Sequence, residues 1–221
     1  MIAISGLEFR FARSDFSLAV SSLQIGAGER VALVGPSGSG KTTLLHLIAG
    51  ILTPARGTIR VADCDISTLG DSARRAFRVS QVGMVFQSFE LVSYLDVWEN
   101  ILLPFRLNPA MRLTPERRQR AEQLARETGL EHRLRYLPHR LSHGERQRVA
   151  ICRALAPAPP LLLADEPTGN LDPTSKQRVV DMLFEQSRRG HATLLMVTHD
   201  TEVAARFPRV LNCRDFAGPA R

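Results

Sequence analysis

The residues from Gly35 to Thr42 have the types and spacing needed to hold a triphosphate. They follow the pattern G-x-x-x-x-G-K-[ST], after a short apolar run and before a predicted helix. Glycines let backbone N–H groups turn inward around phosphate oxygens, and the helix start adds partial positive charge there. We expect Lys41 to reach the β- and γ-phosphates of ATP and Thr42 to bind Mg²⁺. The complete match disfavours the alternative, a glycine-rich turn without a ligand. The predicted phosphate-binding residues are Gly35, Pro36, Ser37, Gly38, Ser39, Gly40, Lys41, Thr42 and Thr43.

Two adjacent carboxylates, Asp165 and Glu166, follow an apolar run at residues 161–164. Such a run predicts a buried strand, and ligands in open α/β sheets bind at the carboxyl ends of the strands. We expect Asp165 to hold Mg²⁺, directly or through water, and Glu166 to act as the general base on an attacking water. A positioned base contributes about 10² to 10⁴ in rate. The alternative, two exposed carboxylates at a strand end, is disfavoured by the phosphate loop elsewhere in the chain.

Apolar patterning places these groups at the ends of predicted strands. Strands are expected at residues 7–11, 17–25, 31–34, 59–61, 82–86, 161–164 and 193–198, and helices at 43–49 and 173–189. Residues 97–156 form an Arg-rich, predominantly helical block, in which Thr114 and Ser142 are predicted N-caps. Pro115 follows the first cap, and Glu145 completes a capping box with the second. The alternation of strand and helix predicts an α/β fold with a largely parallel sheet.

The net charge of the chain limits which kinds of partner it is expected to bind. The net charge is +7, and nearly all the positive charge is arginine, since Lys41 and Lys176 are the only lysines. A positive net charge is compatible with binding to nucleic acid, a membrane surface or acidic partners. An excess of arginine can also arise from genomic composition, and we favour this second explanation. For the Arg-rich surface of residues 112–153 we likewise favour a solvated helix face over contact with anionic lipid.

Three widely spaced cysteines predict free thiols in a reducing compartment.

No secretory signal is visible, and no apolar run approaches the roughly 18 residues of a membrane span. If the protein acts at a membrane, we expect another chain to supply the crossing.

The segment Leu141-Ser142-His143-Gly144-Glu145 is similar to the L-S-G-G-[QE] signature of the ATP-binding subunits of ABC transporters. The resemblance extends over residues 2–212. It implies a P-loop NTPase (RecA-like) core with an antiparallel β subdomain and an inserted α-helical subdomain. It further implies a head-to-tail homodimer in which Ser142 and Gly144 face the γ-phosphate of ATP held by the second copy. A helix N-terminus capped in this way can attract an anion.

Four further residues each resemble a functional residue of the family. Gln87 resembles the glutamine that touches Mg²⁺ and the attacking water and senses the membrane partner; the alternative is a surface residue after a strand. His199 resembles the histidine that contacts the γ-phosphate and orients the water and Glu166. Asp172 resembles an aspartate that crosses the dimer interface, and a plain helix N-cap is equally compatible. Phe11 matches an aromatic residue that stacks on adenine, although its alternation with Phe9 also suits a core position.

Two residues depart from the family pattern. Phe11 stands where many members have tyrosine, and His143 replaces the first glycine of the signature. We expect His143 to lie in the first helical turn, to keep its backbone N–H and to be tolerated. We also hypothesise that its side chain slows dimer closure or makes it pH-dependent.

Residues 165–172, 87–91 and 97–104 resemble a narrower subgroup, the lipoprotein-release, macrolide-export and cell-division ATPase subunits. The resemblance implies integral membrane permease subunits as partners, no nucleic-acid partner, and a place at the cytoplasmic face of the inner membrane. It predicts a single nucleotide-binding domain over 1–221, with an ATP-binding core at 1–87 and 157–221 and a helical signature subdomain at 88–156.

Two other functions stay open at this point. One is an ABC ATPase without a membrane partner, as in DNA repair or translation, although such relatives usually carry paired cassettes or long insertions. The other is an ATP-gated scaffold with little hydrolysis, which the presence of both Glu166 and His199 disfavours.

Overall fold

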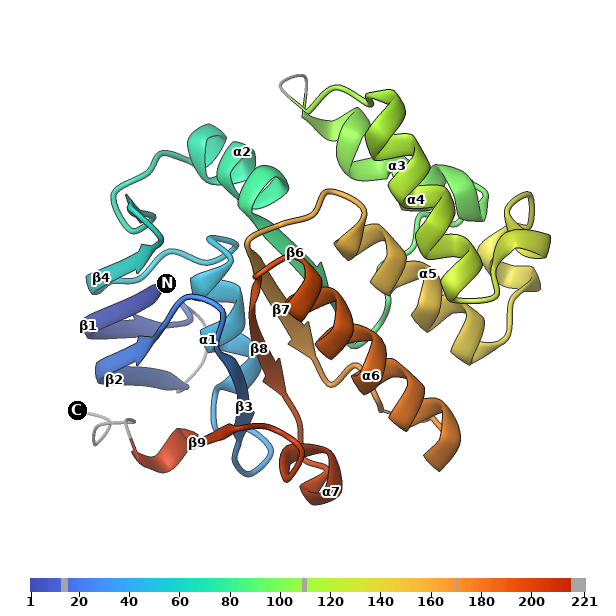
Figure 1. Ribbon diagram of the computed structural model, residues 1–221. Helices are drawn as coiled ribbons and strands as arrows, with labels where there is room; N and C mark the ends of the chain where they lie inside the picture. Colours follow the sequence, from blue (N-terminus) through green and yellow to red (C-terminus); the bar gives the residue numbers. More distant parts are fainter. Residues whose placement is uncertain (13–15, 109–110, 170, 216–221) are drawn as a thin grey trace.

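Five parallel strands form the centre of the molecule (Figure 1). The computed structural model describes residues 1–12, 16–108, 111–169 and 171–215. The strand order is β6-β7-β8-β3-β9, so segments distant in the sequence become neighbours. Since every pairing in this sheet is parallel, the carboxyl ends of the strands meet at one edge. The strands are β3 (Arg30–Val34), β6 (Val82–Val85), β7 (Leu161–Asp165), β8 (Thr193–Val197) and β9 (Arg209–Asn212).

Both faces of this sheet are buried, which explains why its central strands are continuous apolar runs. In β3, β6, β7 and β8, alternate residues enter different hydrophobic clusters. In β7, for example, Leu162 and Ala164 belong to one cluster, whereas Leu161 and Leu163 belong to the other. This period of two is the geometry of a strand. It places a separate layer of the protein on each side of the sheet.

A second, antiparallel sheet and one helix cover the first face. The sheet has the order β2-β1-β4-β5, and the helix α1 (Lys41–Ile48) lies between the two sheets (Figure 1). Leucines of α1 pack against both sheets in one cluster. The strands are β1 (Ile2–Arg10), β2 (Ser17–Ile25), β4 (Arg56–Val61) and β5 (Cys64–Asp65).

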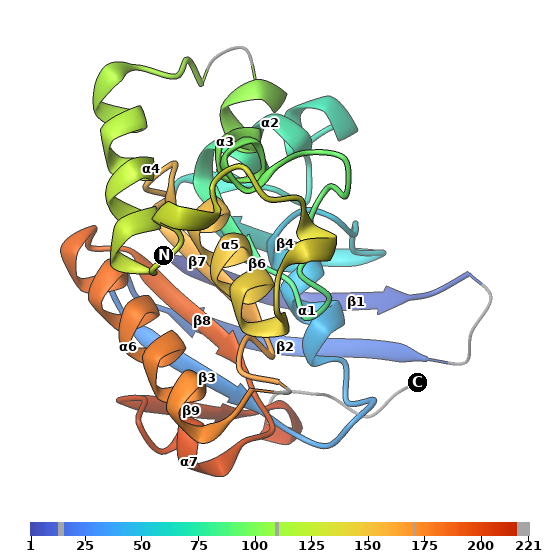
Figure 2. The same ribbon diagram turned by 90° about the vertical axis from the view of Figure 1, so that its right-hand side faces the viewer.

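Helices cover the second face and extend beyond the sheet. The longest is α6 (Pro173–Arg189), which packs Val179, Val180 and Leu183 toward the sheet. Figure 2 shows a group of helices on the side of β6, away from β9. This group consists of α3 (Val97–Leu107), α4 (Pro115–Glu127) and α5 (His143–Leu155). The shorter helices are α2 (Asp71–Gln81) and α7 (Thr201–Ala204).

Side-chain caps start the helices of this group. Asp96 caps α3 and Ser142 caps α5, each in a full capping box with a glutamate at the third helical position, Glu99 and Glu145 respectively. Thr114 caps α4 and accepts a hydrogen bond from the Arg117 amide. The predicted caps at Thr114 and Ser142 are therefore confirmed.

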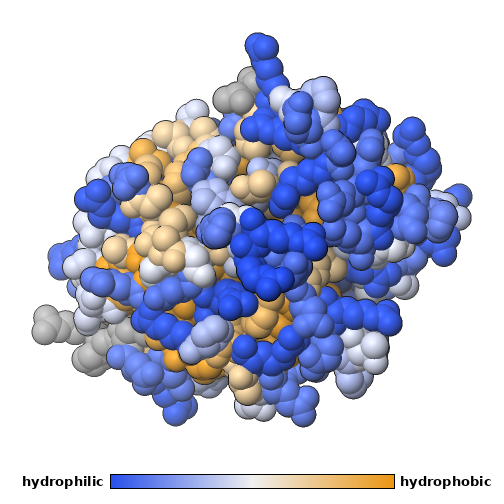
Figure 3. Space-filling view, viewed as in Figure 1, coloured by the Kyte–Doolittle hydropathy of each residue, from blue (hydrophilic) through white to orange (hydrophobic). Residues whose placement is uncertain are grey.

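Several arginine side chains of the Arg-rich helices contact neighbouring residues of the same chain. Hydrophilic side chains cover the face over these helices most densely (Figure 3). Within α4, the Arg117 guanidinium lies 5.7 Å from the Phe105 ring centre, and that of Arg118 lies 5.4 Å from the ring of Trp98. Arg120 donates to the Leu155 carbonyl at 3.3 Å. These arginines stabilise helix packing, which accounts for part of the positive charge without any external partner.

The expected α/β fold is confirmed, and every predicted strand and helix is present within a few residues. Four of the described strands and α-helices were not predicted: α2, β5, α7 and β9. All three cysteines are free. Within the ranges described, no helix is both long and apolar enough to cross a bilayer.

Candidate functional site

The phosphate loop joins the end of β3 to the start of α1 at the carboxyl edge of the parallel sheet. Lys41 is the first residue of α1, and its side chain folds back over the loop. Its Nζ donates to the carbonyls of Gly35 and Pro36, both at 2.9 Å. The lysine is almost completely buried, so its charge sits inside the curve of the loop. A cation held in this way can meet the oxygens of a bound phosphate with little side-chain entropy to lose.

Gly40 shows why this loop requires glycine before the lysine. It has a φ of 89°, in the left-handed region, and caps α1 without a side chain. A Cβ atom there would lie 2.9 Å from Phe16 Cζ, so both the backbone and the space exclude a larger residue.

Phe16 links the predicted adenine-stacking residue to the loop. Its ring centre lies 5.9 Å from that of Phe11, which in turn meets Phe9 edge to face at 4.8 Å. Phe9 is buried, whereas Phe11 is 40% exposed, so Phe11 is not a core residue. Its open ring, one aromatic neighbour away from Gly40, is a suitable platform for a base.

Asp165 ends β7 and is only 3% exposed. Burial raises the pKa of its carboxyl group above the usual range, and a hydrogen bond from the Thr42 hydroxyl opposes that rise. Its Oδ1 is buried without a hydrogen-bond partner. An unpaired carboxylate oxygen beside a hydroxyl fits Mg²⁺, which takes hard oxygen ligands and usually binds one or two carboxylates plus substrate phosphates. The described residues contain no cluster of three His, Cys, Asp or Glu side chains suited to a metal.

Glu166 and His199 form a pair at the same edge. Glu166 follows β7 and His199 follows the neighbouring strand β8, so the sheet register brings them together across 33 residues. The His199 Nδ1 lies 2.8 Å from Glu166 Oε2, and the His199 amide donates to the same oxygen at 3.3 Å. Glu166 has a φ of 46°, which holds its backbone in a left-handed conformation beside the sheet edge. The Glu166 side chain is 12% exposed, whereas that of His199 is 73% exposed and open to a ligand.

The remaining predicted residues lie at three places in the fold. Gln87 is exposed in the turn after β6, at the same carboxyl edge. Ser142 and Gly144 lie at the start of α5, and among the described residues no hydrogen bond or ion pair joins them to the phosphate loop. Asp172 is exposed and is the N-cap of α6, where it accepts from the Ser175 amide at 3.0 Å. The N-cap alternative for Asp172 is thus confirmed, and it leaves its exposed side chain at the surface. Asn170, in the same segment, lies outside the described residues.

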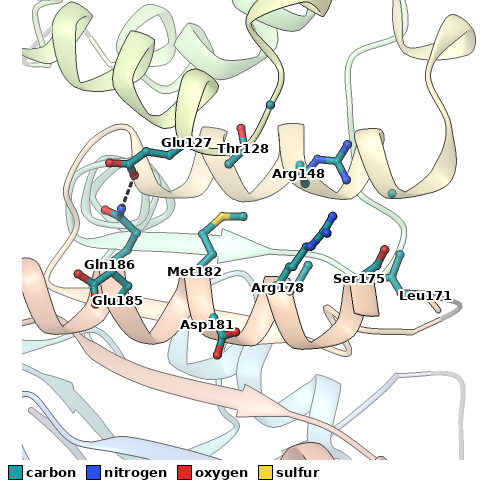
Figure 4. Close-up of a pocket in the computed structure, with 13 residues that line it drawn as sticks. Glu127, Thr128, Arg148, Leu171, Ser175, Arg178, Asp181, Met182, Glu185 and Gln186 are labelled. Carbon is teal, nitrogen blue, oxygen red and sulfur yellow. Dashed lines mark hydrogen bonds between the residues drawn. The ribbon is translucent and has the colours of Figure 1, made fainter. Parts of the chain in front are cut away.

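A cavity of about 620 Å³ lies elsewhere, between α4 and α5 on one side and α6 on the other (Figure 4). Arg148 of α5 and Arg178 of α6 line its two sides, and Gln186 hydrogen-bonds Glu127 at one end. The cavity has none of the phosphate-loop residues in its lining. Its volume therefore does not identify the nucleotide site, which is the open edge described above.

The model of the family described as "ABC transporter" matches residues 18–169, more than half of the chain. The chain belongs to the ABC transporter family. It is an ATP-hydrolysing ABC subunit, as the resemblance implied.

The relatives also confirm the subgroup. The lipoprotein-releasing system ATP-binding protein LolD of Gluconobacter oxydans is 44% identical over 218 residues, which cover 97% of this chain and 93% of the relative. LolD of Pseudomonas fluorescens is 44% identical over 193 residues, or 87% and 84% of the two chains. The macrolide export ATP-binding/permease protein MacB of Rhodopirellula baltica is 43% identical over 97% of this chain. The match spans only 32% of MacB.

Solved structures of ABC cassettes share the fold. A dimeric post-hydrolysis state of the ATP-binding cassette MJ0796, bound to ADP and phosphate, gives a TM-score of 0.87 at 32% identity. The match covers 96% of this chain and 94% of that one. A second dimeric structure of the MJ0796 cassette gives the same TM-score at 33% identity. These neighbours confirm the P-loop NTPase architecture of this ABC subunit.

The structure adds two site residues that sequence reasoning missed. Lys176 on α6 forms an ion pair with Asp200 at 2.7 Å, which holds the segment directly after His199. The sequence does mark Lys176 as unusual, because it is one of only two lysines in the chain. Arg153 on α5 donates to the carbonyls of Phe89 and Glu90 in the turn after Gln87. No sequence signal distinguishes this arginine from its many neighbours.

Proposed function

We propose that this chain binds Mg²⁺ and ATP at the edge formed by the phosphate loop, Asp165 and Glu166, and closes on a second copy of itself. Hydrolysis would then open the dimer and drive separate membrane subunits of the lipoprotein-release or macrolide-export type. The chain would work at the cytoplasmic face of the inner membrane, as a peripheral subunit. The observation that carries the proposal is the Glu166–His199 pair, which lies one strand end away from the phosphate loop.

Binding uses the groups between β3 and α1. The backbone amides of the loop and the Lys41 ammonium would surround the β- and γ-phosphates, with the start of α1 adding partial positive charge. Thr42 and Asp165 would hold Mg²⁺, with Gln87 as a further oxygen ligand; the ion would neutralise charge that develops on the phosphate oxygens. Phe11 would stack on the adenine.

Hydrolysis uses the groups at the ends of β7 and β8. Glu166 would accept a proton from the water that attacks the γ-phosphorus, while the bond to the β–γ bridging oxygen breaks. His199 fixes the Glu166 carboxylate through its amide and ring nitrogen, and its exposed ring would contact the γ-phosphate. Gln87 would help position the water. Each of these groups lies at the carboxyl edge of one sheet, where the γ-phosphate would bind.

A second copy completes the site. The Ser142 hydroxyl accepts from the Glu145 amide at 3.2 Å, which leaves its hydrogen available to donate. Together with the amide of Gly144, it would bind the γ-phosphate held by the other subunit. Among the described residues, no hydrogen bond or ion pair joins this turn to the phosphate loop of its own chain, and the MJ0796 cassettes that share the fold are dimeric. Asp172, exposed before α6, would cross the interface.

A membrane partner has a suitable groove beside Gln87. A cavity of about 220 Å³ opens between α2, β6, α3 and the end of α5, next to the turn that carries Gln87. Apolar side chains line much of it, and Leu107 at its rim is 63% exposed. We assign the groove to a cytoplasmic segment of the permease subunits. Residues 88–156 would form the helical subdomain that moves with that segment, against a core of residues 1–87 and 157–221.

The deciding experiment is steady-state ATP hydrolysis by the Glu166→Gln variant. Loss of the general base is expected to lower turnover by about 10² to 10⁴ while ATP still binds. Glu202→Gln, a change of the same kind at an exposed site on α7, is the matched control and should hydrolyse like the wild type. Equal turnover of Glu166→Gln and wild type would show that Glu166 is not the base.

A second measurement tests the dimer. The Glu166→Gln protein saturated with ATP and Mg²⁺ should double its mass in light scattering, because closure without hydrolysis traps the pair. A monomer under these conditions, alone and with its permease subunits, would contradict the proposal. ATP-dependent binding to DNA or ribosomes would instead favour an ABC ATPase without a membrane partner.

A further inference from the structure

The turn that follows Gln87 has an unusual backbone. Phe89 and Glu90 have φ values of 64° and 49°, so two successive residues other than glycine lie in the left-handed region. Side chains with a Cβ disfavour this conformation, and it persists only where surrounding contacts hold it. The turn therefore needs an external support.

Helix α5 supplies part of that support through Arg153. Its guanidinium donates to the carbonyls of both left-handed residues, Phe89 and Glu90. Arg153 is only 8% exposed, and burial lowers its pKa to about 10, so the group is still charged at neutral pH. Charge-assisted hydrogen bonds of this kind are stronger than neutral ones.

His143, at the opposite end of α5, supplies a second support. Its ring meets the buried Phe89 ring in a T-shaped arrangement, with 4.7 Å between ring centres and 75° between planes. The Arg146 guanidinium lies 5.9 Å from the centre of the same Phe89 ring. Since 143, 146 and 153 are separated by three and seven residues, all three side chains project from one face of the helix. That face contacts both left-handed residues of the turn, Phe89 and Glu90.

We propose that His143 is a positioning residue that ties the signature turn to the Gln87 turn through Phe89. This inference rests on the proposed function of Ser142 and Gln87. Ser142 directly precedes His143, and Gln87 lies two residues before Phe89. The ring contact joins the group that binds the partner's phosphate to the group that positions water and senses the membrane subunits. Glycine, which the signature has at this position in the family, offers no ring for that contact.

The side chain of His143 is therefore directed into its own subunit and packs on an aromatic ring. Its role is a coupling role: when α5 moves toward the second copy, the Gln87 turn moves with it. Such a link should affect turnover more than ATP affinity, because the phosphate loop has no part in it.

The link is tested by hydrogen–deuterium exchange of full-length protein without nucleotide. The Phe89 and Glu90 amides form hydrogen bonds within the turn, to Phe86 and Ser88 carbonyls, and report its opening. His143→Ala is expected to speed exchange in residues 86–91 by roughly two- to tenfold, the range of one aromatic pair. His143→Phe, which keeps a ring, should restore slow exchange. His139→Ala, at an exposed histidine four residues earlier, is the matched control and should change nothing there.

Steady-state kinetics then separates positioning from a general loss of stability. His143→Ala should lower kcat by roughly two- to tenfold with an unchanged KM for ATP, and His143→Phe should recover it. In a Phe89→Leu background, His143→Ala should have no further effect, because the ring contact is already gone. Unchanged exchange at 86–91, or unchanged kcat, in His143→Ala would overturn the inference. Failure of the proposed function is distinguishable, since it would appear as normal turnover of Glu166→Gln while the exchange result stands.

Discussion

The phosphate loop and the Gln87 turn lie at the same edge of one sheet, yet they are held in place in different ways. The loop is built from contiguous backbone, and its lysine bonds carbonyls only five and six residues earlier. The Gln87 turn is held by side chains of α5, with hydrogen bonds that span 63 and 64 residues. A locally built loop stays rigid while other parts of the molecule move. A turn held by a distant helix must follow that helix, which suits a region that transmits motion.

The strongest test of the local site is Asp165→Asn. Removing the carboxylate should abolish most Mg²⁺-dependent turnover, a loss of about 10²-fold or more, since a bound metal contributes several kcal/mol of charge stabilisation. The thermal stability of the variant without nucleotide should change in the opposite direction and increase. Burial raises the pKa of the Asp165 carboxyl, which means that its charge is unfavourable in the folded protein. The isosteric amide should therefore raise Tm while it destroys activity.

Asp181→Asn is the matched control, because Asp181 is an exposed carboxylate on α6 that pairs with Arg206 and belongs to neither the phosphate loop nor the sheet edge. It should leave turnover unchanged. A normal Mg²⁺ requirement in Asp165→Asn would show that the metal is held elsewhere.

The distant support is tested by Arg153→Met. Methionine fills similar space but leaves the carbonyls of Phe89 and Glu90 without their donor, and an unsatisfied buried group costs about 1–3 kcal/mol. Urea denaturation should show a loss of that size, with ATP affinity retained because the phosphate loop is independent. Arg148→Met, on the same helix but facing the cavity beside α6, is the comparison and should cost much less. Equal losses in both variants would mean that the turn draws no special support from Arg153.

Ser142→Ala separates helix capping from phosphate binding. Loss of the cap should cost about 1 kcal/mol of unfolding free energy. Asp96→Ala removes the corresponding cap of α3, also part of a full capping box, and should cost a similar amount. Only Ser142→Ala should weaken ATP-dependent dimerisation, measured by light scattering in the Glu166→Gln background. A dimer equally weakened by both changes would reduce the role of Ser142 to capping.

The same contrast explains what could be predicted from the sequence. The phosphate loop and the Asp165–Glu166 pair are contiguous motifs beside apolar runs, and α6 was placed at its observed limits because a proline and a glycine bound it. The Glu166–His199 pair required the order of β7 and β8, which strand patterns alone do not determine; the family resemblance supplied it.

The unpredicted features depend on tertiary structure. Helix α2 was missed because it is short and rich in arginine and buries only Phe77, although Ala73, Ala76 and Phe77 recur at helical spacing. The left-handed turn at Phe89 was missed because no glycine marks it, and its support comes from His143 and Arg153, far away in the sequence. The sequence showed that His143 departs from the family signature, but it did not show that the His143 ring contacts Phe89.

The smallest effect concerns charge at the start of α5. Backbone hydrogen bonding from Ser142 lowers the pKa of Glu145, with Arg133 adding to the shift. A lowered pKa means that the ionised glutamate stabilises the folded protein above its ordinary pKa of about 4.3, and that this contribution is lost as pH falls through the lowered value. Glu145→Gln should therefore cost about 0.3–1 kcal/mol at neutral pH, the range for a charge at a helix terminus. The difference from wild type should vanish in strong acid, whereas Glu122→Gln, in the middle of α4, should show little effect at any pH. A pH-independent loss in Glu145→Gln would mean that its packing at the signature turn, rather than its charge, stabilises α5.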